Sequence, residues 1–223
     1  MHMNTADAFV PHTDFAHLRR LHARAVRDSV TLIRRVTPAD LALPTPCAAW
    51  ALDALLAHMT AQHHGFAAAA RGEGRDPAHW SVRPPGADPA GQYTAAAESV
   101  IAAFATVDDP ERACALPEFS ATRTFPAVRA LGFHLIDYVV HTWDVARTLD
   151  LDYAPGAELL RAALPIARAV PDGEARLDPA GAFRPGLAVD EDADTLEKIL
   201  AALGRSPRWR SPERGAAGRG TGR

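Results

Sequence analysis

Four polar side chains recur at helical spacing within an otherwise apolar segment. The segment HLIDYVVHTWDVA, residues 134 to 146, carries His134, Asp137, His141 and Asp144. At 100° per residue these four positions fall within an arc of about 80° on one face of a helix. Asp137 and His141 are four residues apart, so their side chains lie one turn apart and can hold one ion between them. This spacing is typical of chelation by an imidazole and a carboxylate.

Two simpler interpretations of the polar stripe remain open. It could be the solvated side of an amphipathic helix, or Asp137 and His141 could share a hydrogen bond without a metal. Against the first, apolar residues occupy most of the remaining circumference, as in a helix surrounded by protein. A carboxylate buried there without a positive partner or a metal costs several kcal/mol.

His58 is the candidate for a third ligand. It lies in a second amphipathic segment, on a face shared with Ala54, Ala61 and other small residues that leave room for an ion. His63 and His64 lie on other faces and are weaker alternatives. Two imidazoles and a carboxylate leave at least one coordination position open, which is the arrangement of catalytic rather than structural zinc. The same donors also suit Fe²⁺ or Ni²⁺.

Four long amphipathic segments must position these residues. Apolar residues at intervals of three and four predict helices over residues 14–36, about 50–70, about 93–107 and about 125–151. The last has Pro126 in its first turn and Thr124 as a candidate cap. Two shorter helices are expected within 155–170 and 190–205, and one helical turn at 38–41. The pattern predicts an all-α, antiparallel four-helix bundle with additional short C-terminal helices.

The connecting segments differ in composition from the helices. Residues 71–92 are rich in Gly, Pro and charge, and we expect a long loop that serves as a lid or substrate wall. It contains Trp80 and Arg83, and Arg83 is a candidate for binding an acidic substrate or cofactor. Residues 111–124 lack a helical period and predict an extended connection. One helical domain over 14–209 follows, with a flexible N-terminus at 1–13 and a disordered tail at 210–223.

Composition narrows the classes of function. The 223 residues are 48% hydrophobic and carry a formal net charge of -3, which argues against a nucleic-acid binder that relies on a basic patch. No stretch approaches the ~18 apolar residues of a membrane span, and no secretory signal is visible, so we expect a cytoplasmic protein acting on a small molecule. Cys47 and Cys114 are expected to be reduced, and Cys47 to act as a small buried hydrophobe.

Three motifs occur together in the sequence: LPTPCAAWALDALLAHM (43–59), DYVVHTWDVAR (137–147) and LAALGRSPRW (200–209). The combination resembles the mycothiol-dependent maleylpyruvate isomerase N-terminal family of DinB-like metal-binding bundles, and more closely its short actinobacterial branch. The resemblance implies a divalent metal, most simply Zn²⁺, held by His58, Asp137 and His141. The isomerase usually has Glu at the acidic position, whereas the shorter relatives often have Asp.

One departure from the family pattern affects the second helix. Relatives generally have Asp or another capping residue directly after the Trp of the first motif, where Ala51 stands here. The start of this helix must therefore rely on Asp53 or on water, at a cost of about 1 kcal/mol. Trp50 and Trp143 of the motifs are expected to be core aromatics.

The resemblance implies a metal-dependent enzyme that uses a low-molecular-weight thiol such as mycothiol. The thiol would be transferred to an electrophilic small molecule or would assist its isomerisation. The isomerase carries a further C-terminal domain, so maleylpyruvate itself is not the expected substrate. A metal-dependent hydrolase and a non-catalytic metal- or ligand-binding module are the alternatives. His134 and Asp144 are the candidate proton-transfer residues; Asp144 could instead orient His141 or pair with Arg147 or a neighbouring helix. Related bundles often form homodimers.

Overall fold

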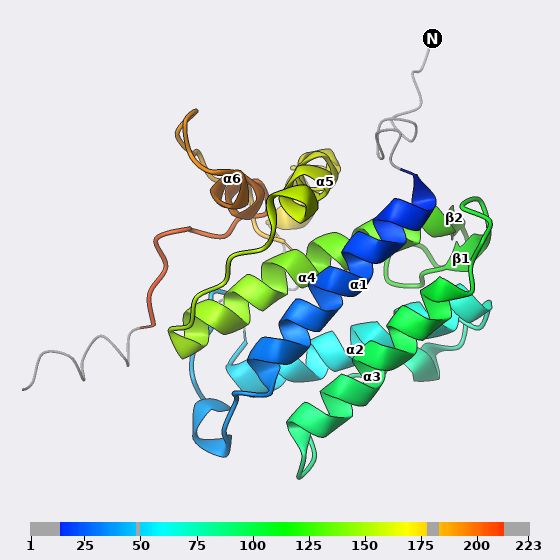
Figure 1. The fold of residues 1–223 in the computed structure, drawn as a ribbon, viewed down its shortest axis with the longest axis horizontal. Helices are drawn as coiled ribbons and strands as arrows, with labels where there is room; N and C mark the ends of the chain where they lie inside the picture. The colour runs from blue at the N-terminus through cyan, green and yellow to red at the C-terminus, as the bar shows by residue number, and fades with distance from the viewer. Residues whose placement is uncertain (1–13, 48–49, 178–182, 212–223) are drawn as a thin grey trace, which may run out of the picture.

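The computed structural model describes residues 14–47, 50–177 and 183–211, and its helices form a four-helix bundle with two further helices on one side (Figure 1). The bundle consists of α1 (Phe15–Ile33), α2 (Leu52–Arg71), α3 (Pro89–Ala105) and α4 (Ala127–Leu149). Helices α5 (Ala157–Ala169) and α6 (Thr195–Ala202) pack on each other, and α5 also packs on α4 and α1. The all-α bundle with short C-terminal helices is confirmed. The expected N-terminus at 1–13 and residues 212–223 of the expected tail lie outside the described residues.

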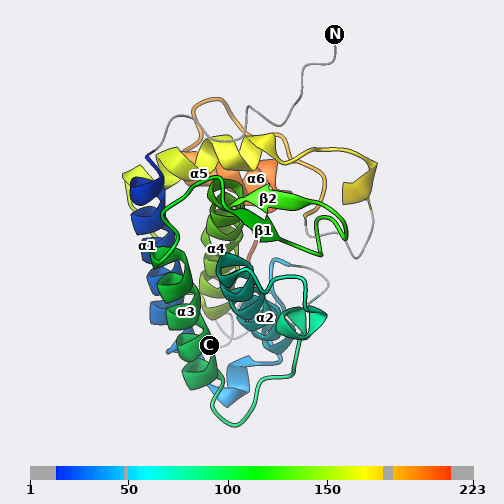
Figure 2. The same ribbon diagram turned by 90° about the vertical axis from the view of Figure 1, so that its right-hand side faces the viewer.

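Each bundle helix has one parallel and one antiparallel neighbour, so the antiparallel arrangement predicted from the sequence holds for only one of its two neighbours. Helix α1 packs on α4 and α3, and α2 packs on the same two helices. Late in α1, Ser29 bonds to Tyr93 early in α3, so this pair is antiparallel, whereas His22 and His134 meet in the first halves of α1 and α4. The connection 72–88 returns the chain along α2 before α3 begins (Figure 2). No helix in the described part of the chain is long and apolar enough to cross a membrane.

Two helix starts differ from the periodicity of the sequence. Helix α3 begins at Pro89, before the first apolar residue of its pattern, because the Asp88 side chain accepts a hydrogen bond from the Gly91 N–H at 2.8 Å. Helix α4 begins at Ala127, and Thr124 does not cap it. Instead, Thr124 lies in β2 (Thr124–Pro126), which pairs antiparallel with β1 (Ala113–Ala115). This small sheet forms within the connection that was expected to be extended.

The start of α2 is satisfied by the preceding connector. Ala51 provides no side-chain cap, but the N–H groups of Leu52 and Asp53 donate to the carbonyls of Leu43 at 3.0 Å and Leu41 at 2.9 Å. Asp53 contributes as expected, because its Oδ1 accepts from the Ala54 N–H at 2.6 Å. The connector includes the predicted helical turn, η1 (Pro38–Asp40). Backbone carbonyls therefore replace most of the missing cap.

Trp80 anchors the Gly- and Pro-rich connection between α2 and α3. It ends a short 3-10 turn, η2 (Pro77–Trp80), is buried against Phe66, and donates from Nε1 to the carbonyl of Gly74 at 2.9 Å. Gly65 permits this close packing, because a Cβ at that position would lie 2.2 Å from the Trp80 ring. The first part of this connection is thus fixed against α2.

Three buried histidines form a row across the bundle core. His22 Nε2 lies 2.8 Å from His134 Nδ1, and His134 Nε2 lies 3.3 Å from His63 Nδ1. His63 and His134 both stack on Tyr138. Burial lowers the pKa of His22 to about 3, and it is also the main reason that the pKa values of His63 and His134 lie well below their usual range. The row is therefore neutral near pH 7.

We predict that acid destabilises the metal-free protein through this row. Each histidine takes up its proton only on unfolding, so its stabilising effect is complete above pH 6.5. As the pH falls below 6.5, the free energy of unfolding decreases by about 1.4 kcal/mol per pH unit for each histidine. Circular dichroism of EDTA-treated protein should show a lower Tm at pH 5 than at pH 7.

The Tm difference should be smaller in His22→Leu, which removes one titrating group. His79→Gln, at a half-buried position of η2 outside the histidine row, should keep the wild-type difference. Equal Tm values at the two pH values in the wild type would contradict a neutral histidine row.

Candidate metal centre

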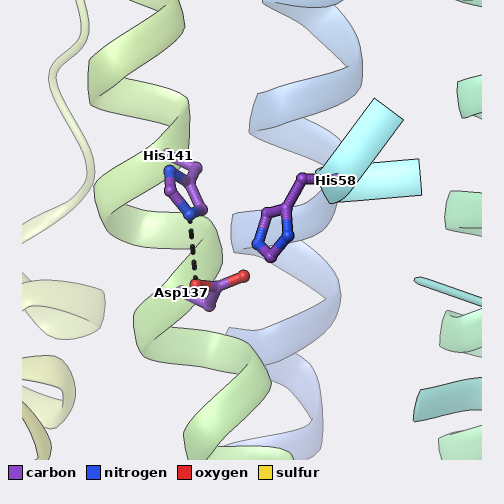
Figure 3. Close-up of side chains that lie close together, drawn as sticks. All are labelled: His58, Asp137 and His141. Atoms are coloured by element: carbon purple, nitrogen blue, oxygen red, sulfur yellow. Dashed lines mark ion pairs between the residues drawn. The ribbon is translucent and has the colours of Figure 1, made fainter. Parts of the chain in front are cut away.

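His58, Asp137 and His141 face one another between α2 and α4 (Figure 3). Asp137 and His141 lie one turn apart on α4, with His141 Nε2 at 3.3 Å from Asp137 Oδ1, and His58 approaches from α2. One ligand atom from each residue lies within 4.8 Å of the others. The structure thus brings together the three residues selected by spacing and by resemblance.

One carboxylate oxygen in this group lacks a hydrogen-bonding partner. Asp137 Oδ2 is buried and no described residue donates a hydrogen bond to it, while the His141 side chain is only 3% exposed. A buried anionic oxygen without a partner costs several kcal/mol, which a bound cation would offset. Two imidazoles and a carboxylate are also ordinary ligands of Zn²⁺. The residues present therefore fit a divalent cation.

The protonation states of the three side chains follow from burial and from one another. Burial lowers the pKa of His58 to about 4, so its imidazole is neutral at pH 7. Burial opposes ionisation of Asp137 and His141, but the attraction between them holds the pKa of Asp137 below its usual value. The same attraction, with a contribution from Asp144, raises the pKa of His141 to about 9. Asp137 and His141 are thus an ion pair in the metal-free protein, and a cation must displace the His141 proton.

Asp144 orients His141 from the side opposite Asp137. Its Oδ2 lies 2.9 Å from His141 Nδ1, which directs Nε2 toward Asp137. The same oxygen lies 3.4 Å from Nη2 of Arg205, in the segment that follows α6. Asp144 is fully buried and Arg205 is 3% exposed. Asp144 was expected to orient His141 or to pair with Arg147 or a neighbouring helix. The structure shows its contact with His141 and a second contact with Arg205 in the segment after α6.

Arg205 also approaches Cys47, with Nη2 at 3.6 Å from the sulfur. Burial raises the pKa of the half-buried Cys47 thiol to about 11, so the thiol is neutral at pH 7. Arg147 does not pair with Asp144: its guanidinium lies over the Trp143 ring and donates to the Trp209 carbonyl. The sequence pattern did not indicate the role of Arg205. This residue lies 61 residues from Asp144, and its only signal in the sequence is its place in the third family motif.

The centre opens into a cavity of about 640 Å³. The cavity lies between α2, α4, the connection that contains β1 and β2, and the segment after α5. Trp50, expected in the core, is half-buried here and packs on His58 with ring centroids 4.6 Å apart. Aromatic side chains form much of the wall: Trp50, Phe66, Phe119, Phe125, Phe133 and Phe183. The polar side chains that share the wall with the three donors include Gln62, Glu118, Arg123 and Arg129.

His134 and Arg83 do not line this cavity. His134 belongs to the buried histidine row and faces His22 on α1, because the 80° arc is wide enough for its two edges to meet different helices. Arg83 lines a separate cavity of about 600 Å³ together with His64 and Arg71. Helix α2 stands between the two cavities, so the Arg83 segment forms no wall of the metal centre. The sequence missed Glu118 and Gln62, whose segments show no metal-ligand or acid–base spacing.

The fold and the site together define a helical-bundle domain with a candidate metal centre of two histidines and one carboxylate beside an aromatic cavity. The sequence model of the family described as mycothiol maleylpyruvate isomerase N-terminal domain matches residues 22–146, which include all three donors. The chain therefore belongs to the mycothiol maleylpyruvate isomerase N-terminal domain family, as the motifs indicated. No curated protein and no solved structure gives a significant match.

We predict that the wild type binds about one divalent ion per chain and that His58→Ala and Asp137→Asn do not. Elemental mass spectrometry of untagged protein, dialysed after incubation with Zn²⁺, measures this directly. His64→Ala, on the other flank of α2, is the matched control and should keep the ion. Metal retained in full by Asp137→Asn would contradict the assignment.

We also predict that Arg205→Met weakens metal binding by about 10- to 100-fold, because Asp144 then loses its cationic partner and holds His141 less firmly. Breaking a buried pair by removing one partner also lowers the free energy of unfolding by about 3–5 kcal/mol. Zinc titration with a competing chelator and urea denaturation measure the two effects. The exposed Arg208→Met should change neither, and wild-type zinc affinity in Arg205→Met would contradict the positioning role.

Proposed function

We propose that this protein is a divalent-metal-dependent enzyme that uses a low-molecular-weight thiol of the mycothiol type. The thiol is either transferred to an electrophilic small molecule or assists the isomerisation of that molecule. The observation that carries the proposal is the unpartnered Asp137 oxygen, which lies beside two histidines at the wall of a cavity large enough for small molecules. Membership of the mycothiol maleylpyruvate isomerase N-terminal domain family supports the choice of a thiol.

Each residue of the centre has a part in this proposal. His58, Asp137 and His141 hold the metal, and Asp144 keeps His141 in the tautomer that presents Nε2. A bound divalent ion, most simply Zn²⁺ and with Ni²⁺ or Fe²⁺ as alternatives, lowers the pKa of a coordinated thiol, so that a thiolate is available near neutral pH. Three protein ligands leave a position for that sulfur.

The cavity wall supports a small electrophile as the second reactant. Phe119, Phe125 and Phe133 pack on one another, with the Phe119 and Phe133 rings stacked at 4.7 Å, and provide a surface for an apolar or planar group. Arg123 and Arg129 line the same cavity and favour a carboxylate or carbonyl group.

Mycothiol should raise the Tm of the zinc-loaded protein, because a ligand at 100 times its dissociation constant stabilises the folded state by about 2.7 kcal/mol. The analogue in which serine replaces the cysteine of mycothiol is the matched control and should give a much smaller shift. Mycothiol should have no effect on metal-free Asp137→Asn. Equal shifts with the thiol and its hydroxyl analogue would contradict thiol coordination and favour a hydrolase or a non-catalytic binding module.

A further inference from the structure

Glu118 is held at the rim of the metal cavity by a side chain from the helix that carries His58. Gln62 is only 3% exposed, and its Nε2 donates to both carboxylate oxygens of Glu118, at 2.9 and 3.0 Å. Gln62 follows His58 by four residues on α2. Its side chain therefore lies one helical turn, about 5.4 Å, along α2 from the metal ligand. This contact holds the Glu118 carboxylate in the wall of the cavity that the three candidate ligands also line.

Glu118 lines the cavity of the metal centre without belonging to the group of candidate ligands. Its carboxylate oxygens are not among the ligand atoms of His58, Asp137 and His141 that lie within 4.8 Å of one another. It is therefore placed to contact a molecule in the cavity rather than to bind the same ion.

Glu118 is exposed at the rim of the cavity, and the pKa of its carboxyl group lies above its usual value. Partial burial is the largest cause of the raised pKa of Glu118; the Gln62 hydrogen bond opposes it and the negative charge of Asp137 adds to it. The titratable and charged groups that face the same cavity are His58 on α2, Asp137, His141 and Arg129 on α4, and Arg123 on the connection before α4.

We propose that Glu118 is the catalytic acid–base residue of this cavity and exchanges a proton with the carbon skeleton of an α,β-unsaturated carbonyl substrate. The inference rests on the proposed thiol-dependent function. As the sulfur lone pair forms the C–S bond at the β-carbon, the C=C electron pair moves to the α-carbon, which takes the proton of the Glu118 carboxylic acid. The carboxylate then recovers a proton from solvent, equivalent to the one the thiol released on ionising. Elimination reverses these steps, with Glu118 as the base.

Glu118→Gln separates proton transfer from a structural role. Its amide oxygen still accepts a hydrogen bond from Gln62, but the side chain no longer titrates. Glu118→Asp retains a carboxyl group on a shorter side chain. Glu111→Gln is the matched control, because it lies on the same connection and does not line the cavity.

The experiment combines three measurements on the full chain. The ultraviolet sulfur-to-cobalt band of Co²⁺-loaded protein with N-acetylcysteine reports thiol binding. Turnover of cis-4-oxopent-2-enoate with the same thiol reports catalysis. Carbon-13 NMR of protein labelled at the glutamate carboxyl carbons, with Glu118→Gln to assign the signal, reports the titration of Glu118.

The proposal predicts that Glu118→Gln keeps the cobalt band and metal content but loses about 100-fold or more in kcat with little change in KM. Glu118→Asp should recover part of the lost rate, Glu111→Gln should match the wild type, and Glu118 should titrate above the value of about 4.3 of an exposed glutamate. Wild-type kcat in Glu118→Gln, an ordinary Glu118 titration, or a wild type that binds the thiol without turnover would overturn the proposal and leave thiol binding intact. Absence of the cobalt band from the wild type would instead remove the proposed function, and the Glu118 role with it.

Discussion

The structure around the candidate site depends on balancing two carboxylates that α4 carries into the interior. Asp144 is fully buried, and each carboxylate has one buried oxygen, Oδ1 of Asp144 and Oδ2 of Asp137, without a hydrogen-bond partner among the described residues. Arg205 and His141 both contact Asp144, while the ion pair of Asp137 is with His141. A buried charge tolerates such an arrangement only when another positive group completes it. The proposed cation at His58, Asp137 and His141 would supply that group for Asp137.

The bundle topology places the three candidate ligands at a defined point. Helix α2 runs antiparallel to α4, and its His58 faces the gap between the two α4 ligands (Figure 3). Backbone carbonyls from the preceding connector fix the start of α2, and Trp80 packs on its second half. The segment after α6 reaches the same region through Arg205, which contacts Asp144 beside His141. Rigid helices hold the ligands, while connections form the cavity wall.

The sequence predicted the parts of this arrangement that depend on helical period. Spacing alone identified Asp137 and His141 as neighbours, and the amphipathic pattern predicted the four long helices. Period fixes the direction of a side chain around its helix but not the neighbour it meets, which is why His134 joins a core histidine row rather than the metal centre. Glu118 and Arg205 lie in connections without a period. Their contacts with Gln62 and Asp144 arise only from tertiary packing.

X-ray absorption at the zinc edge, before and after addition of mycothiol, tests the central claim most directly. The account predicts a first shell of nitrogen and oxygen at about 2.0–2.1 Å, with the outer-shell scattering of two imidazoles, in the thiol-free protein. Mycothiol should add one sulfur at about 2.3 Å, and Asp137→Asn should bind too little zinc to give either spectrum. A thiol-free shell without imidazole scattering, or a first shell that mycothiol leaves unchanged, would contradict the account.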